Sequence, residues 1–460
     1  MKRYISIATF FLLLGASTQA QLSPLKVSAN GRYFVTADGK PFFWLGDTGW
    51  LLFTKLTREQ TDQYLEQRRR QGFNVIQVMV LHGLTAVNRY GDAALIKKNV
   101  AEPKITPGNN FSDSVQYDYW DHIEYVIDKA AEKGLYVGLV PVWGSNVKGG
   151  GVSRQQATAY AKFLAERYRS KPNIIWMNGG DIKGSDSLAV WKAIGSTLHQ
   201  YDPNHLITYH PMGRTPSSQW FHKEDWLAFN MFQSGHRRYE QDTSKNDLRY
   251  GEDNWKYVKA DYAMKPVKPT LDGEPSYEGI PQGLHDTTQP YWNDNDVRRY
   301  AYWSVFAGAA GFTYGHNAVM QFYQPGDKNS AYGAKIFWTA AMNAKGAAQM
   351  QYLKQLILSE PYLERVPDQS LVAGVPGEKY NRVLATKGKN YALLYTYRGQ
   401  KINVQMGKII GTKVKASWFS PRDGKTQPIG SFDNKGTQSF DPPGEPADGN
   451  DWVLILESSL

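Results

Sequence analysis

Short apolar runs that end in polar residues recur along the first 360 residues of the chain. In residues 173–181 an apolar stretch leads into Asn178-Gly179-Gly180-Asp181. Such a run, bounded by turn residues, is typical of a buried strand in a parallel sheet. Seven further strands are predicted on the same grounds, at residues 41–47, 73–81, 135–140, 206–209, 268–272 and 311–314, and in a run that begins at residue 227.

Helical patterns separate most of these runs. Helices are predicted at residues 57–71, 117–133, 153–169, 185–201, 252–264 and 294–309, with a long closing helix at 334–357. Thr57 is a candidate N-cap with Gln60 three residues later, and Gly72 would end the same helix. No convincing helix connects the fifth and sixth runs. Eight strand-then-helix units predict a (β/α)8 TIM barrel.

The pattern changes after about residue 361. Short strand-like runs lie at residues 372–374, 382–386, 391–397, 402–406, 413–419 and 452–457, separated by Asn, Gly and Pro turns. They predict a small antiparallel β-sandwich. We therefore expect a catalytic barrel at residues 21–360 and a β-sandwich domain at residues 361–460, packed directly against each other because no low-complexity linker separates them.

Residues 1–20 have the features of a secretory signal peptide. Lys2 and Arg3 precede an apolar stretch at residues 5–14, and Thr18-Gln19-Ala20 forms a cleavage site before Gln21. The apolar stretch is too short to span a membrane as a helix, and no later segment is long enough either. The expected product is an exported protein, periplasmic or extracellular and soluble after cleavage.

The amino-acid composition limits the kinds of active site and partner that the chain can have. The chain has no cysteine, which excludes a thiol nucleophile and cysteine-ligated metals. Its formal net charge of +10 falls to +8 without Lys2 and Arg3; this favours an anionic partner or serves solubility. The basic residues are scattered, so we expect no nucleic-acid partner. The 14 Trp and 29 Tyr residues provide flat rings that suit sugar faces.

Two carboxylates follow predicted strands on opposite sides of the barrel. Asp181 follows the fourth strand and Glu274 the seventh. Glycoside hydrolysis needs such a pair, one to protonate the leaving oxygen and one to attack carbon or activate water. A separation of about 5–5.5 Å would give retention, and a wider one inversion. An Asp after two glycines is more often a turn residue or N-cap, and Asp272 and Glu278 compete with Glu274.

Other polar or aromatic residues near predicted strand ends are candidates for substrate binding. The set comprises Asp47, His82, Trp143, Asn178, His210, Asn230, Gln233, His236, Tyr277 and His316. Trp143 suits a sugar platform and a core position equally. The histidines lack metal-ligand spacing, so we expect hydrogen bonding to hydroxyls and neither metal nor cofactor. Four acidic residues near the carboxyl terminus are expected in a solvated loop rather than a calcium site: Asp441, Glu445, Asp448 and Asp451.

Four motifs resemble glycoside hydrolase family 140, the apiosidase-like enzymes of pectin degradation. They lie at residues 43–50, at 74–77, at Asn178-Gly179-Gly180-Asp181 and at residues 273–278. The resemblance implies a barrel with a carboxyl-terminal domain known in this group as "putative collagen-binding". It also implies cleavage of the apiose–galacturonate linkage of rhamnogalacturonan II, an acidic pectin, with Asp181 as acid/base and Glu274 as nucleophile of a retaining glycosidase.

Two alternatives stay open. The same barrel could act on another plant glycan, with specificity set by the long polar insertion at residues 84–114. The chain could also be a non-catalytic surface protein that binds glycan or collagen, because a binder could keep the paired carboxylates as inherited scaffold.

Overall fold

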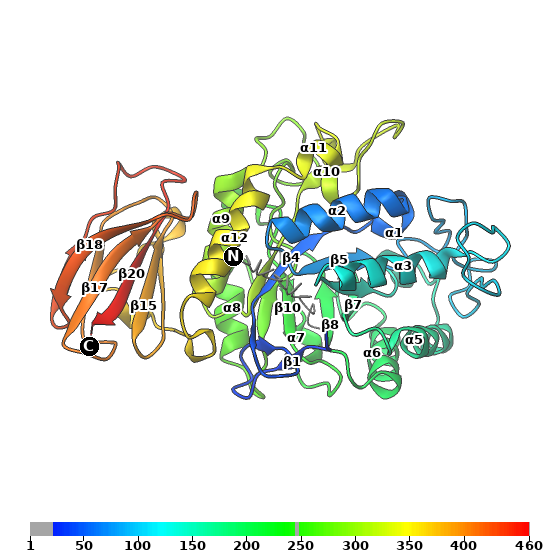
Figure 1. The fold of residues 1–460 in the computed structure, drawn as a ribbon, viewed down its shortest axis with the longest axis horizontal. Helices are drawn as coiled ribbons and strands as arrows, with labels where there is room; N and C mark the ends of the chain where they lie inside the picture. The colour runs from blue at the N-terminus through cyan, green and yellow to red at the C-terminus, as the bar shows by residue number, and fades with distance from the viewer. Residues whose placement is uncertain (1–21, 244–247, 460) are drawn as a thin grey trace, which may run out of the picture.

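The computed structural model describes residues 22–243 and 248–459. The signal peptide predicted at residues 1–20 lies outside this part of the chain. Figure 1 shows two units side by side, a barrel with surrounding helices and a β-domain that contains the carboxyl-terminal strands.

Eight parallel strands of the described chain form the barrel. In chain order they are β4 (Trp44–Thr48), β5 (Val75–Met79), β6 (Tyr136–Val140), β7 (Ile174–Ile182), β8 (Ile207–Pro211), β10 (Asn230–Gln233), β11 (Thr270–Asp272) and β12 (Gly311–Tyr314). Each strand pairs with the next except β8 and β10, and β12 pairs back to β4. The Ala228 N–H donates to the Ile207 carbonyl at 2.8 Å, where β8 and β10 meet. The predicted TIM barrel is confirmed.

The main helices follow the expected order. They are α2 (Arg58–Arg70), α3 (Tyr119–Glu132), α5 (Arg154–Tyr168), α6 (Leu188–Tyr201), α8 (Trp255–Tyr262), α9 (Asp294–Phe306) and α12 (Lys345–Leu358). Thr57 caps α2 in a reciprocal pair with Gln60, as predicted. Between β8 and β10 lie only the short strand β9 (Thr215–Pro216), which pairs antiparallel with β10, and the one-turn helix α7 (Ser218–Phe221). This agrees with the missing helical pattern there.

Two predicted elements are divided in the structure. The closing helix expected at 334–357 consists of α11 (Trp338–Ala341) and α12, separated at residues 342–344. Arg68 and Gln71 donate side-chain hydrogen bonds to the Met342 carbonyl at 3.1 and 2.8 Å, in place of the next helical turn. The first predicted strand is also divided: β3 (Pro41–Phe42) pairs with β2 (Phe34–Val35), which pairs with β1 (Lys26–Val27), and only β4 enters the barrel.

The β-domain contains a six-stranded and a two-stranded antiparallel sheet. The larger has the order β13 (Val366–Pro367), β14 (Val383–Lys387), β15 (Tyr391–Thr396), β20 (Trp452–Ser459), β17 (Lys413–Phe419) and β18 (Thr426–Asp433); the smaller pairs β16 (Ile402–Gln405) with β19 (Thr437–Phe440). The strand expected at 372–374 is wrong, since only Val372 forms an isolated bridge, to Val404. Strands β13, β18 and β19 were not predicted; β18 is exposed along almost its whole length and so has no apolar alternation.

The two units share a core along α9, which Figure 1 shows between the barrel and β15. Tyr302 of α9 stacks on Tyr395 of β15 with ring centroids 4.8 Å apart. Arg298 and Asp451 form a buried ion pair across the same interface, with Nε 3.0 Å from Oδ2. Two other acidic residues of the predicted solvated loop also face basic partners: Asp448 faces Arg398 at 2.9 Å, and Asp441 faces Lys401 at 3.5 Å.

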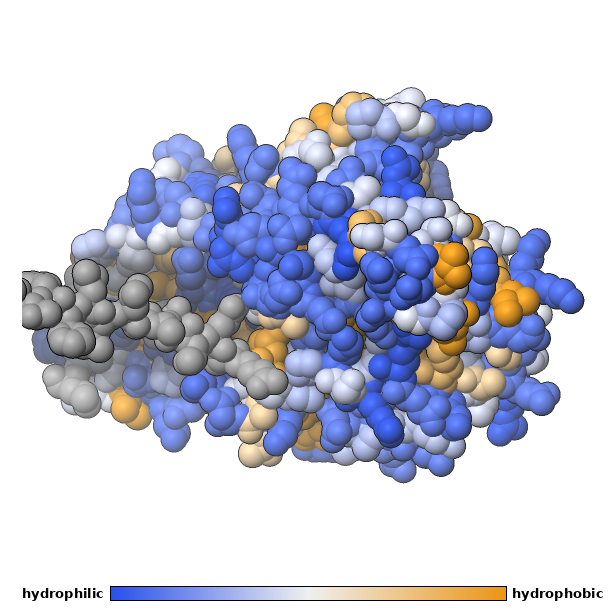
Figure 2. All heavy atoms as spheres, turned by 45° about the vertical axis from the view of Figure 1, so that its right-hand side comes forward, coloured by the Kyte–Doolittle hydropathy of each residue, from blue (hydrophilic) through white to orange (hydrophobic). Residues whose placement is uncertain are grey.

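Hydrophilic side chains predominate on the face that Figure 2 displays, and hydrophobic ones form small, separate spots. Among the helices of residues 22–243 and 248–459, none combines the length and the apolar composition that a membrane crossing requires.

Candidate active site

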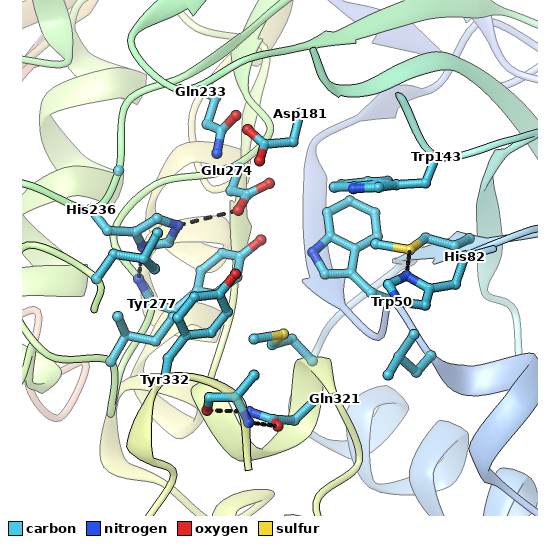
Figure 3. Close-up of a pocket in the computed structure, with 18 of the residues that line it drawn as sticks. Trp50, His82, Trp143, Asp181, Gln233, His236, Glu274, Tyr277, Gln321 and Tyr332 are labelled. Carbon is cyan, nitrogen blue, oxygen red and sulfur yellow. Dashed lines mark hydrogen bonds and ion pairs between the residues drawn. The ribbon is translucent and has the colours of Figure 1, made fainter. Parts of the chain in front are cut away.

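The carboxyl ends of the barrel strands surround a pocket of about 570 Å³. Parallel barrels position their functional side chains at this end of the strands. Seven of the twelve residues expected at the site line the pocket: His82, Trp143, Asp181, Gln233, His236, Glu274 and Tyr277. In Figure 3 the carboxyl group of Asp181 lies next to that of Glu274 on one wall of the pocket.

Asp181 stands on a bulge near the end of β7. The register against β8 shifts between Gly179 and Ile182, and the φ angles of Gly179, Gly180 and Asp181 are +94°, +114° and +49°. A Cβ on Gly180 would lie 2.5 Å from the Trp143 ring, and one on Gly179 would lie 2.6 Å from the His210 carbonyl oxygen. The glycines therefore let β8 and Trp143 approach β7 closely. Asp181 is the one exposed residue of this buried strand.

Glu274 lies just beyond β11, between two histidines. Nε2 of His210 is 3.1 Å from Oε2, and Nε2 of His236 is 3.2 Å from Oε1. The backbone N–H groups of Asp181 and Tyr277 donate to Nδ1 of His210 and His236, at 3.4 and 3.3 Å. Since each Nδ1 accepts a hydrogen bond, we assign the imidazole protons to Nε2. His236 then presents a donor to Glu274, as Figure 3 shows, and Nε2 of His210 lies close to the other carboxylate oxygen.

These surroundings shift the two carboxyl groups in opposite directions. Desolvation in the pocket wall and the charge of Glu274 raise the pKa of Asp181 to about 6. Burial alone would raise the pKa of Glu274, but the interactions of its carboxylate with His210 and His236 outweigh burial and lower that pKa to about 2. Near pH 5 the pair therefore holds a protonated Asp181 beside an ionised Glu274, which suits a proton donor and a nucleophile.

Aromatic side chains stand on two sides of the carboxylates. Trp143 lies against Trp50 with ring centroids 5.3 Å apart, and Tyr277 and Tyr332 stand opposite them (Figure 3). Trp143 is half-buried, so it both packs on Gly180 and presents ring surface to the pocket. Trp50 and Tyr332 were not among the predicted residues. Rings on both sides of a pocket suit the apolar faces of a sugar.

The pocket also contains two arginines that sequence reasoning missed. Arg214 lies 3.5 Å from Asp242, as an ion pair. Arg237 lines the pocket half-buried, and its guanidinium has neither a hydrogen bond nor an ion pair with the residues that the structure describes. Both residues lie in loops, where no hydrophobic periodicity indicates which way a side chain points.

Five predicted residues lie outside the pocket lining, and four of them have partners away from the pocket. Asp47 is fully buried, with Oδ2 2.7 Å from Arg68 Nε. Asn178 donates to the Trp191 carbonyl of α6 at 2.7 Å. Asn230 lies 3.2 Å from His222 Nδ1, and His316 accepts the Ala318 N–H at 3.1 Å as the cap of helix α10 (Asn317–Met320). The expectation that these four side chains lie at the site is therefore wrong, because each side chain is turned toward a partner behind or beside its strand. His210 also lies outside the lining but contacts Glu274 from behind.

The competitors of Glu274 have other partners. Asp272 is buried and accepts hydrogen bonds from Ser234 and Asn254, at 2.5 and 3.1 Å. Glu278 accepts one from the Tyr314 hydroxyl at 2.6 Å. Of the three carboxylates, Glu274 is the one that lines the pocket. Across residues 22–243 and 248–459, no three His, Asp or Glu side chains are grouped as ligands of one metal ion would be.

Comparison with known proteins agrees with this geometry. Residues 28–364 match the family described as "Apiosidase-like, catalytic domain". The chain belongs to this apiosidase-like family. Residues 366–457 match a "Putative collagen-binding domain of a collagenase". No curated protein matches the chain.

Solved structures extend the finding for this apiosidase-like chain. One described as "Glycoside hydrolase" is 49% identical, covers 95% of this chain and 97% of its own, and has a TM-score of 0.90. A glycoside hydrolase family 5 structure from Bacteroides vulgatus ATCC 8482 is 46% identical, covers 95% of this chain and 94% of its own, and has a TM-score of 0.89. The apiosidase-like chain is therefore a glycoside hydrolase, and the non-catalytic alternative is set aside.

Proposed function

We propose that this glycoside hydrolase cleaves the bond between apiose and galacturonic acid in the pectin rhamnogalacturonan II. The observation that carries the proposal is the pair of carboxylates on one pocket wall, with the pKa of Asp181 raised to about 6 and that of Glu274 lowered to about 2. The family match to apiosidase-like domains supports the choice of sugar.

The proposed reaction is a double displacement with retention. Glu274 attacks the anomeric carbon of apiose, the bond from that carbon to the galacturonate oxygen breaks, and Asp181 transfers its proton to that oxygen. Water then attacks the same carbon, gives its proton to Asp181 and frees Glu274. His210 and His236 would keep Glu274 ionised before each attack.

Arg214 and Arg237 support an acidic leaving group. Arg214 interacts electrostatically with Asp181, so it lies on the side of the proposed proton donor. The leaving sugar occupies that side in an acid-catalysed cleavage. Arg237, without a partner in the described chain, can offer its planar donors to a galacturonate carboxylate.

The test is to measure sugar release from rhamnogalacturonan II oligosaccharides and, in parallel, from a panel of other plant polysaccharides. Asp181→Ala and Glu274→Gln serve as matched inactive variants. We expect apiose from wild type alone, and proton NMR of the first product should show retention. Release of a different sugar from another polysaccharide, with none from rhamnogalacturonan II, would overturn the proposed substrate in favour of another plant glycan.

A second substrate tests the acidic leaving group. Galacturonate carboxyls can be reduced to alcohols, which removes the charge. Arg237→Met should lower kcat/KM on the acidic substrate by about tenfold or more, the loss expected for one charge-assisted hydrogen bond. On the reduced substrate the variant and wild type should be equal. An equal loss on both substrates would contradict carboxylate recognition by Arg237.

We also propose that the protein is exported. The proposal rests on the charged start, apolar stretch and cleavage site within residues 1–20. Expression of the full chain followed by fractionation should yield a mature protein that begins at Gln21 outside the cytoplasm. An intact amino terminus in the cytoplasmic fraction would contradict it.

A further inference from the structure

One loop carries both His236 and Arg237 to the pocket, and the β-domain contacts the far side of that loop. It starts after β10 and contains Tyr239 in a three-residue turn. The Tyr239 backbone N–H donates to Glu252 Oε1 at 3.3 Å. The Tyr380 hydroxyl, from the β-domain, donates to the same oxygen at 2.8 Å. One carboxylate oxygen therefore joins the active-site loop to the β-domain.

The side chain of Glu252 is also fixed by a residue of the barrel. It is fully buried, and Oε2 lies 2.6 Å from a guanidinium nitrogen of Arg299 on α9. A buried carboxylate must keep its partners, since losing one leaves charge without solvation. The barrel supplies the cation, and the β-domain supplies the hydroxyl.

The β-domain also encloses Arg299. The guanidinium lies over the rings of Tyr380 and Tyr397 at 4.8 and 5.2 Å, on the β-domain side. Tyr300 and Trp303 contact it from α9, at 4.9 and 5.0 Å. Tyr380 additionally packs on Tyr239, with ring centroids 5.7 Å apart. The β-domain thus reaches the loop directly through a ring contact with Tyr239 and indirectly through its hydrogen bond to Glu252.

The catalytic end of the loop is held separately. The backbone N–H groups of Ser234 and Gly235 donate to the Glu274 carbonyl, each at 3.1 Å, and Gly283 donates to the His236 carbonyl at 2.8 Å. Arg237 and Arg238 lie between these contacts and the Glu252 contact at Tyr239. A shift at Tyr239 would therefore reach the imidazole that donates to Glu274.

We propose that the β-domain is a positioning component of the active site: Tyr380, through Glu252, holds the segment 234–242 so that His236 meets Glu274. Tyr380 is a positioning residue and touches no substrate. The inference rests on the proposed role of Glu274 as the nucleophile. It gives the β-domain a task within the reaction that is separate from any binding of glycan or collagen.

Tyr380→Phe removes the hydroxyl and keeps the ring. The matched control is Tyr395→Phe, which removes another buried interface hydroxyl, 3.3 Å from Asp451 and in contact with α9 rather than with the loop. Hydrogen exchange of peptides covering 234–242 should become faster in Tyr380→Phe and stay unchanged in Tyr395→Phe. This measurement needs no substrate. Unchanged exchange in Tyr380→Phe would overturn the inference.

Kinetics test the path through His236. Tyr380→Phe should lower kcat by about tenfold, the loss of one hydrogen bond to a charged group, with little change in KM. In a His236→Phe background the same substitution should cost nothing more, because the donor that it positions is gone. Additive losses would overturn the path through His236. If wild type releases no apiose while exchange still responds to Tyr380→Phe, the proposed function fails and the loop coupling stands.

Discussion

The ends of β7 and β11 each present one carboxylate to the same pocket, but they hold it in opposite ways. Asp181 stands on a bulge with three consecutive positive φ angles and is exposed to the pocket. Glu274 is buried between two imidazoles, whose Nε2 atoms lie 3.1 and 3.2 Å from its carboxylate oxygens. The first arrangement raises a pKa to about 6 and the second lowers one to about 2.

This comparison shows that the surroundings of each carboxyl group, rather than its being Asp or Glu, determine which one serves as the acid and which as the nucleophile. Removing water destabilises a carboxylate when no donor replaces it, and donors fixed in place restore the charged form. Both ends belong to one barrel rim, so a few side chains suffice to separate two pKa values by about four units. Each of the following substitutions changes one of the groups that produce this difference in pKa.

The largest effect is expected at the β11 end. Glu274→Gln keeps the shape of the side chain but removes the nucleophile, so kcat should fall by about 10³-fold or more. The measurement is apiose release at saturating substrate. Thermal unfolding serves as the control, and a variant with normal stability and near-normal turnover would exclude Glu274 as nucleophile.

Asp181→Ala should cost about 10²- to 10⁴-fold on the natural linkage, because a poor leaving group needs the proton. Wild-type activity should decline as the pH rises through about 6, since only the protonated form of Asp181 donates. The variant should lack this decline and should lose much less activity on an aryl apioside, whose leaving group needs no proton. Equal losses on both substrates would refute the acid role.

Gly180→Ala tests the strained bulge itself. The new Cβ would lie 2.5 Å from the Trp143 ring on a backbone with φ of +114°, so Asp181 and Trp143 must shift. We expect a loss of about 100-fold in kcat/KM from misplacement and a loss of about 1–3 kcal/mol in the free energy of unfolding. Gly83→Ala is the matched control, because nothing lies within 4 Å of the position that its Cβ would take. Similar results for both variants would show that the bulge does not determine activity.

The smallest effect is expected from His236→Phe. Its removal takes one donor from Glu274, so the pKa of Glu274 should rise above about 2 and the acid limb of the pH profile should move to higher pH. Near pH 5 we expect about a tenfold loss. The limb at about pH 6 belongs to Asp181 and should change less. A profile whose acid limb does not move would contradict the role of His236.

Much of the fold could be predicted because burial leaves a local trace in sequence. The run at 173–181 and its seven counterparts are apolar because parallel barrel strands are covered on both faces. Where burial leaves no such trace, the prediction failed: β18 is nearly all exposed, and the break before α12 depends on Arg68 and Gln71, about 270 residues away in sequence.

The site was predictable to the level of strand ends and no further. Asp181 and Glu274 were expected at the pocket and lie there. Asp47, His316 and two asparagines were expected beside them, but their side chains turn to Arg68, to a helix end, to Trp191 and to His222. At a strand end the alternation of faces stops, so the direction of a side chain depends on backbone geometry and partners.

The sequence by itself determined the order of the barrel strands and the two strand ends at which Asp181 and Glu274 lie. The reason is that each buried strand is a local run of apolar residues. Only the tertiary structure shows that His210 and His236 both contact Glu274 and that Trp143 packs against Gly180. The same holds for the presence of Arg237 in the pocket. These residues are far apart in the chain, and only closure of the barrel brings them within bonding distance. The electrostatic difference between the two carboxylates therefore belongs to the folded barrel.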